Sequence, residues 1–185
     1  MKKELIFDLS NYGHSFGVRN KISRLVWNST YWVFFRPFAS RFFKKWRVFV
    51  LKCFGTQIEW STHIYASARI WAPWNLKIGE NSCLGPKVDC YNQGNIHIGA
   101  NTVISQKTHL CASTHDYTKN NFPLVLKPIT IGNGVWIAAD AFIGPSVIIG
   151  NNAVIAARSV VIKDVDENTV VGGNPAKFIK SRSFE

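Results

Sequence analysis

The sequence predicts an all-β solenoid, a parallel β-helix built from six-residue repeats, with a helical segment in front of it. Three observations predict this fold. A large, mostly aliphatic residue recurs every six positions from Ile98 to Val161, with one interruption near His115. A small or branched residue follows four positions after each large one, and the same phase extends back to Ile58. A period of six fits neither a strand nor a helix, so it indicates a chain that turns a corner every six residues.

The repeat also predicts the shape of each coil. A two-residue step interrupts the sixes at 76–78, 96–98 and 129–131. Three sixes and one such step then make one circuit, which gives a triangular cross-section with a strand on each side. Glycine follows several of the large residues, and we expect these glycines to supply the backbone freedom that corners require. They are Gly79, Gly85, Gly99, Gly132, Gly144 and Gly150.

Charge and aromatic residues are concentrated in residues 1–57. The chain of 185 residues carries a net charge of +11, and this segment holds eleven Lys or Arg against two acidic residues. It also holds 14 aromatic residues, whereas the repeat region is nearly neutral. A chain of this length forms one domain. Because the basic excess belongs to one segment, we do not expect nucleic acid as a partner.

The segment 1–57 is predicted to be helical. In its second half one helical face collects the apolar residues Phe38, Phe42, Trp46, Phe49, Val50 and Cys53. The basic residues fall mainly elsewhere: Arg41, Lys44, Lys45, Arg47 and Lys52. Two compatible interpretations remain open. The segment caps the open end of the β-helix, where strand edges would be exposed, or residues 20–54 contact an anionic membrane surface.

The same segment bears on localisation. The uncharged run 25–35 is too short to span a bilayer. No apolar run follows closely on Met1, as a secretory signal would require. We therefore expect a cytoplasmic protein, free or at the inner face of the membrane. The four cysteines form no CxxC pair and should be free thiols, and Cys90 occupies an inward position of the repeat.

The interruption of the repeat carries the strongest chemical signal. Insertions in a solenoid often carry function. His115 falls one residue after the small inward position of Thr114, so it should face outward at the root of a loop over 116–128. An imidazole titrates near neutrality and can serve as a general base. The neighbouring Asp116, or a backbone carbonyl, would orient its ring. His109 should point in a different direction.

The chain resembles the hexapeptide-repeat acyltransferases, which have a left-handed parallel β-helix. The resemblance is carried by the rows IGNGVWIAADAFIGPSVIIGNNAVIAARSVVIKDV and VVGGNPAKFIK, and is strongest from Ile78 to Lys180. It is greatest to the colanic acid biosynthesis acetyltransferases and to the maltose and galactoside O-acetyltransferases. It implies a left-handed β-helix and direct acetyl transfer from acetyl-CoA. We expect the catalytic β-helix over 58–167 and a tail over 168–185. We also expect a homotrimer, because a cleft deep enough for CoA forms when two prisms lie side by side. His115 matches the catalytic histidine of the family.

The resemblance also implies a cofactor site along the later turns. The pantetheine arm would lie beside Trp136, Ala138, Ala139, Ala156 and Ala157. Small residues there would let the arm reach the backbone amides, although Trp136 could instead have a packing role. The nucleotide phosphates would face Lys163, Lys177 and Lys180.

The acceptor end departs from the maltose and galactoside enzymes. Those have an asparagine where this chain has Gly85, and an aspartate near the position of Gln93. The polar residues available here for an acceptor are Asp89, Tyr91, Asn92 and Asp116. We therefore do not expect a free maltose-like sugar as the acceptor. The colanic-type relatives imply a sugar hydroxyl on an intermediate of exopolysaccharide or surface-glycan assembly, with or without a lipid attached.

Three other possibilities stay open. The first is an N-acetyltransferase that acts on a nucleotide-linked amino sugar. The second is a non-catalytic assembly or binding module. The third concerns the mechanism: Cys111 would act as a nucleophile and accept the acyl group. No histidine spacing suggests zinc, so we assign no metal.

Overall fold

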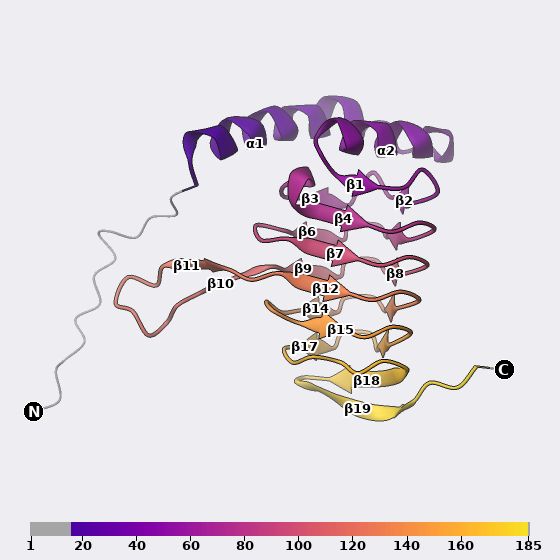
Figure 1. Cartoon of the computed structure of the whole chain (residues 1–185). Helices are drawn as coiled ribbons and strands as arrows, with labels where there is room; N and C mark the ends of the chain where they lie inside the picture. Colours follow the sequence, from indigo (N-terminus) through magenta and orange to yellow (C-terminus); the bar gives the residue numbers. More distant parts are fainter. Residues whose placement is uncertain (1–15, 185) are drawn as a thin grey trace, which may run out of the picture.

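The computed structural model describes residues 16–184, and these form a parallel β-helix with helices across one end (Figure 1). This confirms the predicted fold class. One sheet contains β1 (Gln57–Ile58), β4 (Leu76–Ile78), β7 (Ile96–Ile98), β12 (Ile129–Ile131) and β15 (Ile148–Ile149). A second contains β2 (His63–Ile64), β5 (Cys83–Leu84), β8 (Val103–Ile104), β13 (Trp136–Ile137), β16 (Val154–Ile155), β18 (Thr169–Gly173) and β19 (Ala176–Ser181).

The third sheet positions the candidate acceptor residues. It contains β3 (Arg69–Ile70), β6 (Asp89–Tyr91), β9 (His109–Cys111), β14 (Phe142–Ile143) and β17 (Val160–Val161). Between β9 and β12 the chain leaves the coils and forms a hairpin of β10 (Ser113–His115) and β11 (Leu124–Leu126). A short 3₁₀-helix, η3 (Pro73–Asn75), precedes β4.

The core confirms the six-residue repeat. Ile58, Ile78, Ile98, Ile131 and Ile149 stand in one column, because each pairs in register with the next along the first sheet. All five are buried. The large residue of each repeat therefore stacks on its equivalent in the following coil, and burial of these columns supplies most of the driving force for folding.

The expected reason for the glycines was wrong. A Cβ on Gly79 would lie 2.6 Å from the backbone nitrogen of Ala100, so this glycine is required by the close approach of neighbouring coils. The left-handed backbone conformation occurs elsewhere in the corners, for example at Asn81 with φ 56° and Asp140 with φ 59°. Asn and Asp tolerate this conformation better than other non-glycine residues.

A layer of helices covers the end of the β-helix beside β1, β2 and β3 (Figure 1). This helical layer consists of α1 (Val18–Thr30), the π-helix η1 (Tyr31–Phe35), the 3₁₀-helix η2 (Arg41–Phe43) and α2 (Lys44–Cys53). Trp27, Phe35, Val48 and Leu51 are buried and belong to the hydrophobic core. The indole Nε1 of Trp27 also donates to the carbonyl of Ile70 at 2.7 Å, which ties α1 to the third sheet.

The predicted apolar face of the second helix was right only in part: Val50 is buried and Trp46 packs against the core, but other members face solvent. Phe42 is 96% exposed, and Phe49 and Cys53 are exposed as well. Arg47, expected off the apolar face, is buried and donates to the carbonyls of Ile64, Phe38 and Ser40. The reason is that α2 begins only at Lys44, after a 3₁₀ turn with a different period, so Phe38 and Phe42 do not continue its face.

The structure describes only part of the predicted N-terminal segment and shows strands in the predicted C-terminal tail. Residues 1–15 of the basic segment lie outside the described residues. Within 16–184, none of the helices is long and apolar enough to cross a membrane. The segment expected as a tail contains β18, which pairs in parallel with β16, and β19, which pairs antiparallel with β18.

Candidate active site

His115 lies on the hairpin rather than on a coil. Ser113 pairs with Leu126 and His115 pairs with Leu124 in the antiparallel register of β10 and β11. The chain therefore leaves the repeat at Ser113, three residues before the expected start of the insertion, and Thr114 is not an inward corner residue. The hairpin projects well away from the coils (Figure 1). Strand pairing gives the histidine a more rigid support than a loop would.

The ring of His115 is oriented by a backbone carbonyl. Its Nδ1 lies 2.6 Å from the carbonyl oxygen of Phe122. A carbonyl only accepts hydrogen bonds, so Nδ1 carries the proton and Nε2 carries the lone pair of the neutral ring. We expected either Asp116 or a backbone carbonyl to orient the ring, and in the structure the backbone carbonyl of Phe122 does so.

Asp116 instead shapes the hairpin loop. Its Oδ1 accepts hydrogen bonds from the backbone N–H of Thr118 at 3.1 Å and from the Thr118 hydroxyl at 2.6 Å. Its Oδ2 lies 3.8 Å from Nζ of Lys119. The Thr118 hydrogen bonds hold the pKa of the Asp116 carboxyl below its usual value. This carboxylate is thus engaged within its own turn.

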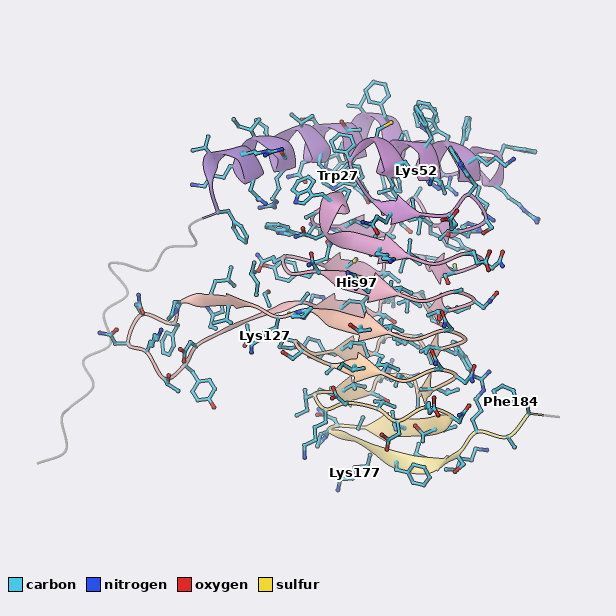
Figure 2. All side chains as sticks on the ribbon, viewed as in Figure 1. Trp27, Lys52, His97, Lys127, Lys177 and Phe184 are labelled. Carbon is cyan, nitrogen blue, oxygen red and sulfur yellow. The ribbon has the colours of Figure 1, made fainter. Side chains whose placement is uncertain are left out.

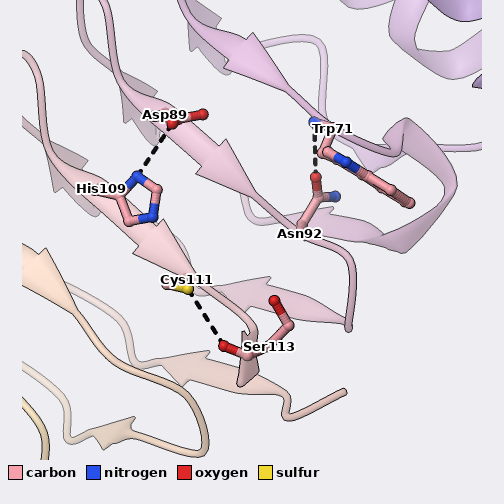
Figure 3. A network of polar contacts seen from close by, with 6 residues as sticks. All are labelled: Trp71, Asp89, Asn92, His109, Cys111 and Ser113. Carbon is pink, nitrogen blue, oxygen red and sulfur yellow. Dashed lines mark hydrogen bonds and ion pairs between the residues drawn. The ribbon is translucent and has the colours of Figure 1, made fainter. Parts of the chain in front are cut away.

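A second polar group on the third sheet was not predicted (Figure 3). Oδ2 of Asp89 lies 3.1 Å from Nδ1 of His109, and hydrogen bonds to Asp89 and then to Cys111 raise the pKa of His109 to about 9. The hydrogen bond to His109 in turn lowers the pKa of the Cys111 thiol. The spacing could have revealed the pair, because Asp89 and His109 are one circuit apart, like Ile78 and Ile98.

A pocket of about 330 Å³ lies between α1, η1 and the third sheet. Its lining combines aromatic rings, two arginines and one carboxylate: Arg24, Trp27, Asn28, Tyr31, Trp32, Arg69, Ile70, Trp71, Asp89 and Tyr91. The guanidinium of Arg24 lies 3.7 Å from the centre of the Trp71 ring, a cation–π contact. We call this the α1 pocket. It contains Asp89 and Tyr91, two of the predicted acceptor residues.

Asn92 has a structural role instead. The side chain is fully buried, and its Oδ1 accepts from the backbone N–H groups of Trp71 and Ala72 at 3.0 Å. Its Nδ2 donates to the carbonyl of Ala72 at 2.6 Å. We therefore remove Asn92 from the candidate acceptor residues.

The structure brings five predicted cofactor residues together. An open groove of about 510 Å³ is lined by Trp136, Ala138, Ala139, Ala156 and Ala157, with Ser105, Gln106 and Val154. We call it the alanine groove. Trp136 is 50% exposed, and its indole Nε1 donates to the hydroxyl of Ser105 at 3.1 Å. The ring therefore forms a wall of the groove rather than part of the core.

Not all the backbone amides of the groove are available as expected. The N–H groups of Ala138 and Ala156 donate to the carbonyls of Ile155 and Val171 in the following coil. The N–H groups of Ala139 and Ala157 have no backbone partner among the described residues. Among the alanines of this corner, the backbone N–H groups left to bind a molecule in the groove are therefore those of Ala139 and Ala157.

Two of the three predicted lysines lie together, and the third lies apart from them. Lys163 and Lys177 line a third hollow of about 290 Å³ at the far end of the β-helix, together with Asp164 and Asp166. Lys180 lies on β19 opposite Val170 and is not part of that lining. Within residues 16–184, no group of three or more His, Cys, Asp or Glu side chains is placed to hold a metal ion.

Comparison with known proteins places the chain in a family. Residues 128–163 match the family model described as bacterial transferase hexapeptide (six repeats). The chain is 38% identical over 177 residues to WcaF of Escherichia coli K12, which is named as a colanic acid biosynthesis acetyltransferase, and the match covers 95% of this chain and 97% of that one. The chain belongs to the hexapeptide-repeat acetyltransferases.

Solved structures agree with this assignment. A maltose O-acetyltransferase from Clostridium difficile 630 superposes with a TM-score of 0.80 at 25% identity, covering 92% of each chain. A hexapeptide-repeat acetyltransferase from Vibrio cholerae, solved in complex with acetyl-CoA, has the same fold, with a TM-score of 0.72 at 22% identity and 91% of each chain covered. With the relative at 38% identity, this establishes that the chain described here is an acetyltransferase.

Proposed function

We propose that this acetyltransferase moves the acetyl group of acetyl-CoA to a sugar hydroxyl during exopolysaccharide or surface-glycan assembly, with His115 as the general base. The observation that carries the proposal is the bond from Nδ1 of His115 to the carbonyl of Phe122. It fixes the tautomer in which Nε2 is basic, on a hairpin that projects beside the coils.

The chemistry follows from that tautomer. The acceptor oxygen attacks the thioester carbonyl as Nε2 of His115 takes its proton. The tetrahedral intermediate then expels the CoA thiolate, which recovers the proton from the imidazolium. Transfer is direct, so Cys111 forms no acetyl-enzyme, although the neighbouring His109 lowers the pKa of its thiol.

The alanine groove supports a role in binding the pantetheine arm. Side chains larger than alanine would fill it, and the N–H groups of Ala139 and Ala157 are available to amide carbonyls of the arm. The Vibrio cholerae protein of the same fold was solved with acetyl-CoA. Lys163 and Lys177 would bind the nucleotide phosphates; Lys180, outside their hollow, would contribute less.

The α1 pocket supports an acceptor that carries an anionic group. Tyr91 offers an aromatic ring to a sugar, Trp71 holds the guanidinium of Arg24 by a cation–π contact, and Arg24 and Arg69 offer donors to a phosphate or carboxylate. The pocket lies close to the hairpin, because Tyr91 pairs in register with Cys111, two residues before β10 begins. Asp89, held by His109, would accept a hydrogen bond from a sugar hydroxyl.

The relatives favour a glycan acceptor. Besides WcaF, a protein of Escherichia coli named for O-acetyl transfer in lipopolysaccharide biosynthesis is 33% identical over 145 residues. The alternative acceptor, an amino sugar linked to a nucleotide, requires an amine in place of the hydroxyl. The non-catalytic alternative is set aside, since the chain is an acetyltransferase.

One assay tests the proposal. Purified protein is given acetyl-CoA with neutral oligosaccharides, phosphorylated or carboxylated oligosaccharides, or nucleotide-linked amino sugars, and released CoA thiol is measured. We expect release with the anionic glycans and an alkali-labile ester in the product. An alkali-stable amide on an amino sugar would establish the alternative. Turnover only with neutral sugars would contradict the role of Arg24 and Arg69.

A further inference from the structure

The helices α1 and η1 are apolar on both sides. Their inward side packs Trp27, Tyr31 and Phe35 against the end of the β-helix. Their outward side should be polar in a surface helix. It instead carries a row of exposed apolar side chains, of which Leu25 is 68% and Trp32 66% exposed: Val18, Ile22, Leu25, Val26, Trp32 and Val33. Single exposed apolar residues need no explanation, but six of them along one helical segment do.

The second half of the helical layer continues this surface. Phe42, Phe43 and Phe49 are all exposed and lie in η2 and α2. The layer lies flat across the end of the prism, and Figure 2 shows its side chains projecting away from the coils. The exposed apolar side chains of both helices therefore belong to the solvent-exposed side of one layer at the end of the molecule. We call this side the end face.

The charge around the end face has one sign. Residues 16–58 contain nine Lys or Arg and no acidic residue. Four of these basic residues are exposed: Arg19, Lys21, Arg41 and Lys45. Arg47 is instead buried and donates its hydrogen bonds to backbone carbonyls. Exposed aromatic and aliphatic side chains bordered by basic residues are the composition of helices that lie in a membrane interface. An anionic lipid surface matches both the apolar and the cationic part.

We infer that the end face of this protein binds the surface of an anionic lipid bilayer, with α1 and α2 lying in its plane. The helices are too short to cross the bilayer, so the contact is peripheral. Rings such as Phe42 would enter the boundary between head groups and acyl chains, while Lys21, Arg41 and Lys45 would contact lipid phosphates.

This membrane contact would place the α1 pocket next to the lipid surface. Arg24 and Trp32 line that pocket and belong to α1 and η1, so the pocket opens beside the membrane-bound layer. If the proposed function holds, a glycan carried on a membrane lipid would present its phosphate and first sugars to this pocket. The membrane contact itself does not depend on that function.

Vesicle sedimentation of the full chain tests the inference. We expect the protein to sediment with vesicles of phosphatidylcholine and phosphatidylglycerol, to bind far less to phosphatidylcholine alone, and to be released by salt. The charge variant Lys21→Gln, Arg41→Gln, Lys45→Gln should lose about fivefold in vesicle affinity per substitution. The apolar variant Leu25→Ser, Val33→Ser, Phe42→Ser should lose binding at any salt concentration.

Matched variants on the coils control for general loss of charge or apolar area. Lys77→Gln, Lys87→Gln, Lys107→Gln and, separately, Val103→Ser, Ile148→Ser change exposed residues away from the end face. They should bind vesicles as the wild type does. Circular dichroism and thermal unfolding establish that every variant is folded.

Several outcomes would overturn the inference. Wild-type protein that stays in solution with anionic vesicles at low salt would do so. So would coil variants that lose as much binding as the end-face variants. If the end face instead binds a second copy of the chain, the apolar variant without vesicles would have a lower molecular mass than the wild type, and this result would also overturn the inference. Acetyl transfer to short soluble acceptors should persist in both end-face variants, so loss of vesicle binding is distinguishable from failure of the proposed function.

Discussion

At the scale of single residues, the site depends on two histidines that are held in different ways. His115 is bonded to a carbonyl, which selects a tautomer and leaves the ring able to accept a proton. His109 is paired with the carboxylate of Asp89, which favours its protonated form. Because a general base must be neutral near the working pH, the pairing of His109 argues against it as the base and in favour of His115.

The His109–Asp89 pair makes a prediction about stability and pH. The pKa of His109 is raised from 6.5 to about 9 in the folded protein, so its contribution to the free energy of unfolding is complete below about pH 6.5 and lost as the pH rises through about 9. Both side chains are partly exposed, so the contribution should stay within about 1 kcal/mol. Thermal unfolding of Asp89→Asn should show a lowered Tm near neutrality and little difference above about pH 10. An equal loss at both pH values would contradict the pairing.

At the scale of elements, the helical layer is where sequence and structure differ most. Charge and aromatic content predicted a helical segment, and the segment is helical within the described residues. The orientation of α2 was not predictable from a single helical period, because a 3₁₀ turn precedes it. The burial of Arg47 was equally hidden, since it depends on carbonyls of the distant Ile64 as well as of Phe38 and Ser40.

Two substitutions in the layer separate its inward and outward sides. Trp27→Ala removes a fully buried ring and its hydrogen bond to Ile70, so it should lower the free energy of unfolding by about 3–5 kcal/mol. Phe42→Ala removes an almost fully exposed ring and should change it by less than about 0.5 kcal/mol. Urea unfolding monitored by circular dichroism measures both. Similar losses for the two variants would mean that Phe42 packs inward after all.

The coils were largely predictable, and the site was predictable only in part. A strict period fixes which residues face inward, so the buried columns and Cys90 followed directly from spacing. The same spacing places Asp89 beside His109 on neighbouring strands, but this pair was not predicted from the sequence. The α1 pocket could not be predicted from the sequence, because it depends on how α1 packs across the third sheet and places Arg24 over Trp71.

At the scale of the whole molecule, the alanine groove and the hairpin suggest an assembly. The groove is open along one side, and the hairpin projects away from its own coils (Figure 1). A second copy placed alongside would close the groove and receive the hairpin, where Tyr117 is 82% exposed. We predict a homotrimer with three sites between neighbouring copies.

Sedimentation equilibrium combined with activity tests the homotrimer. Tyr117→Asp, at the exposed part of the hairpin, should shift the protein toward monomer and reduce turnover together. Lys107→Glu, on a corner of the coils, provides a control for added negative charge. A monomeric wild-type protein with full activity would contradict the shared site.

The central claim is that His115 removes the acceptor proton. Its most direct test is the turnover of His115→Ala against that of His97→Ala, an exposed histidine of β7, with acetyl-CoA affinity measured separately by calorimetry. We predict that His115→Ala lowers kcat by about 10²–10⁴-fold while the Kd for acetyl-CoA stays within about twofold of wild type, and that His97→Ala changes neither. Near-normal turnover in His115→Ala would contradict the claim.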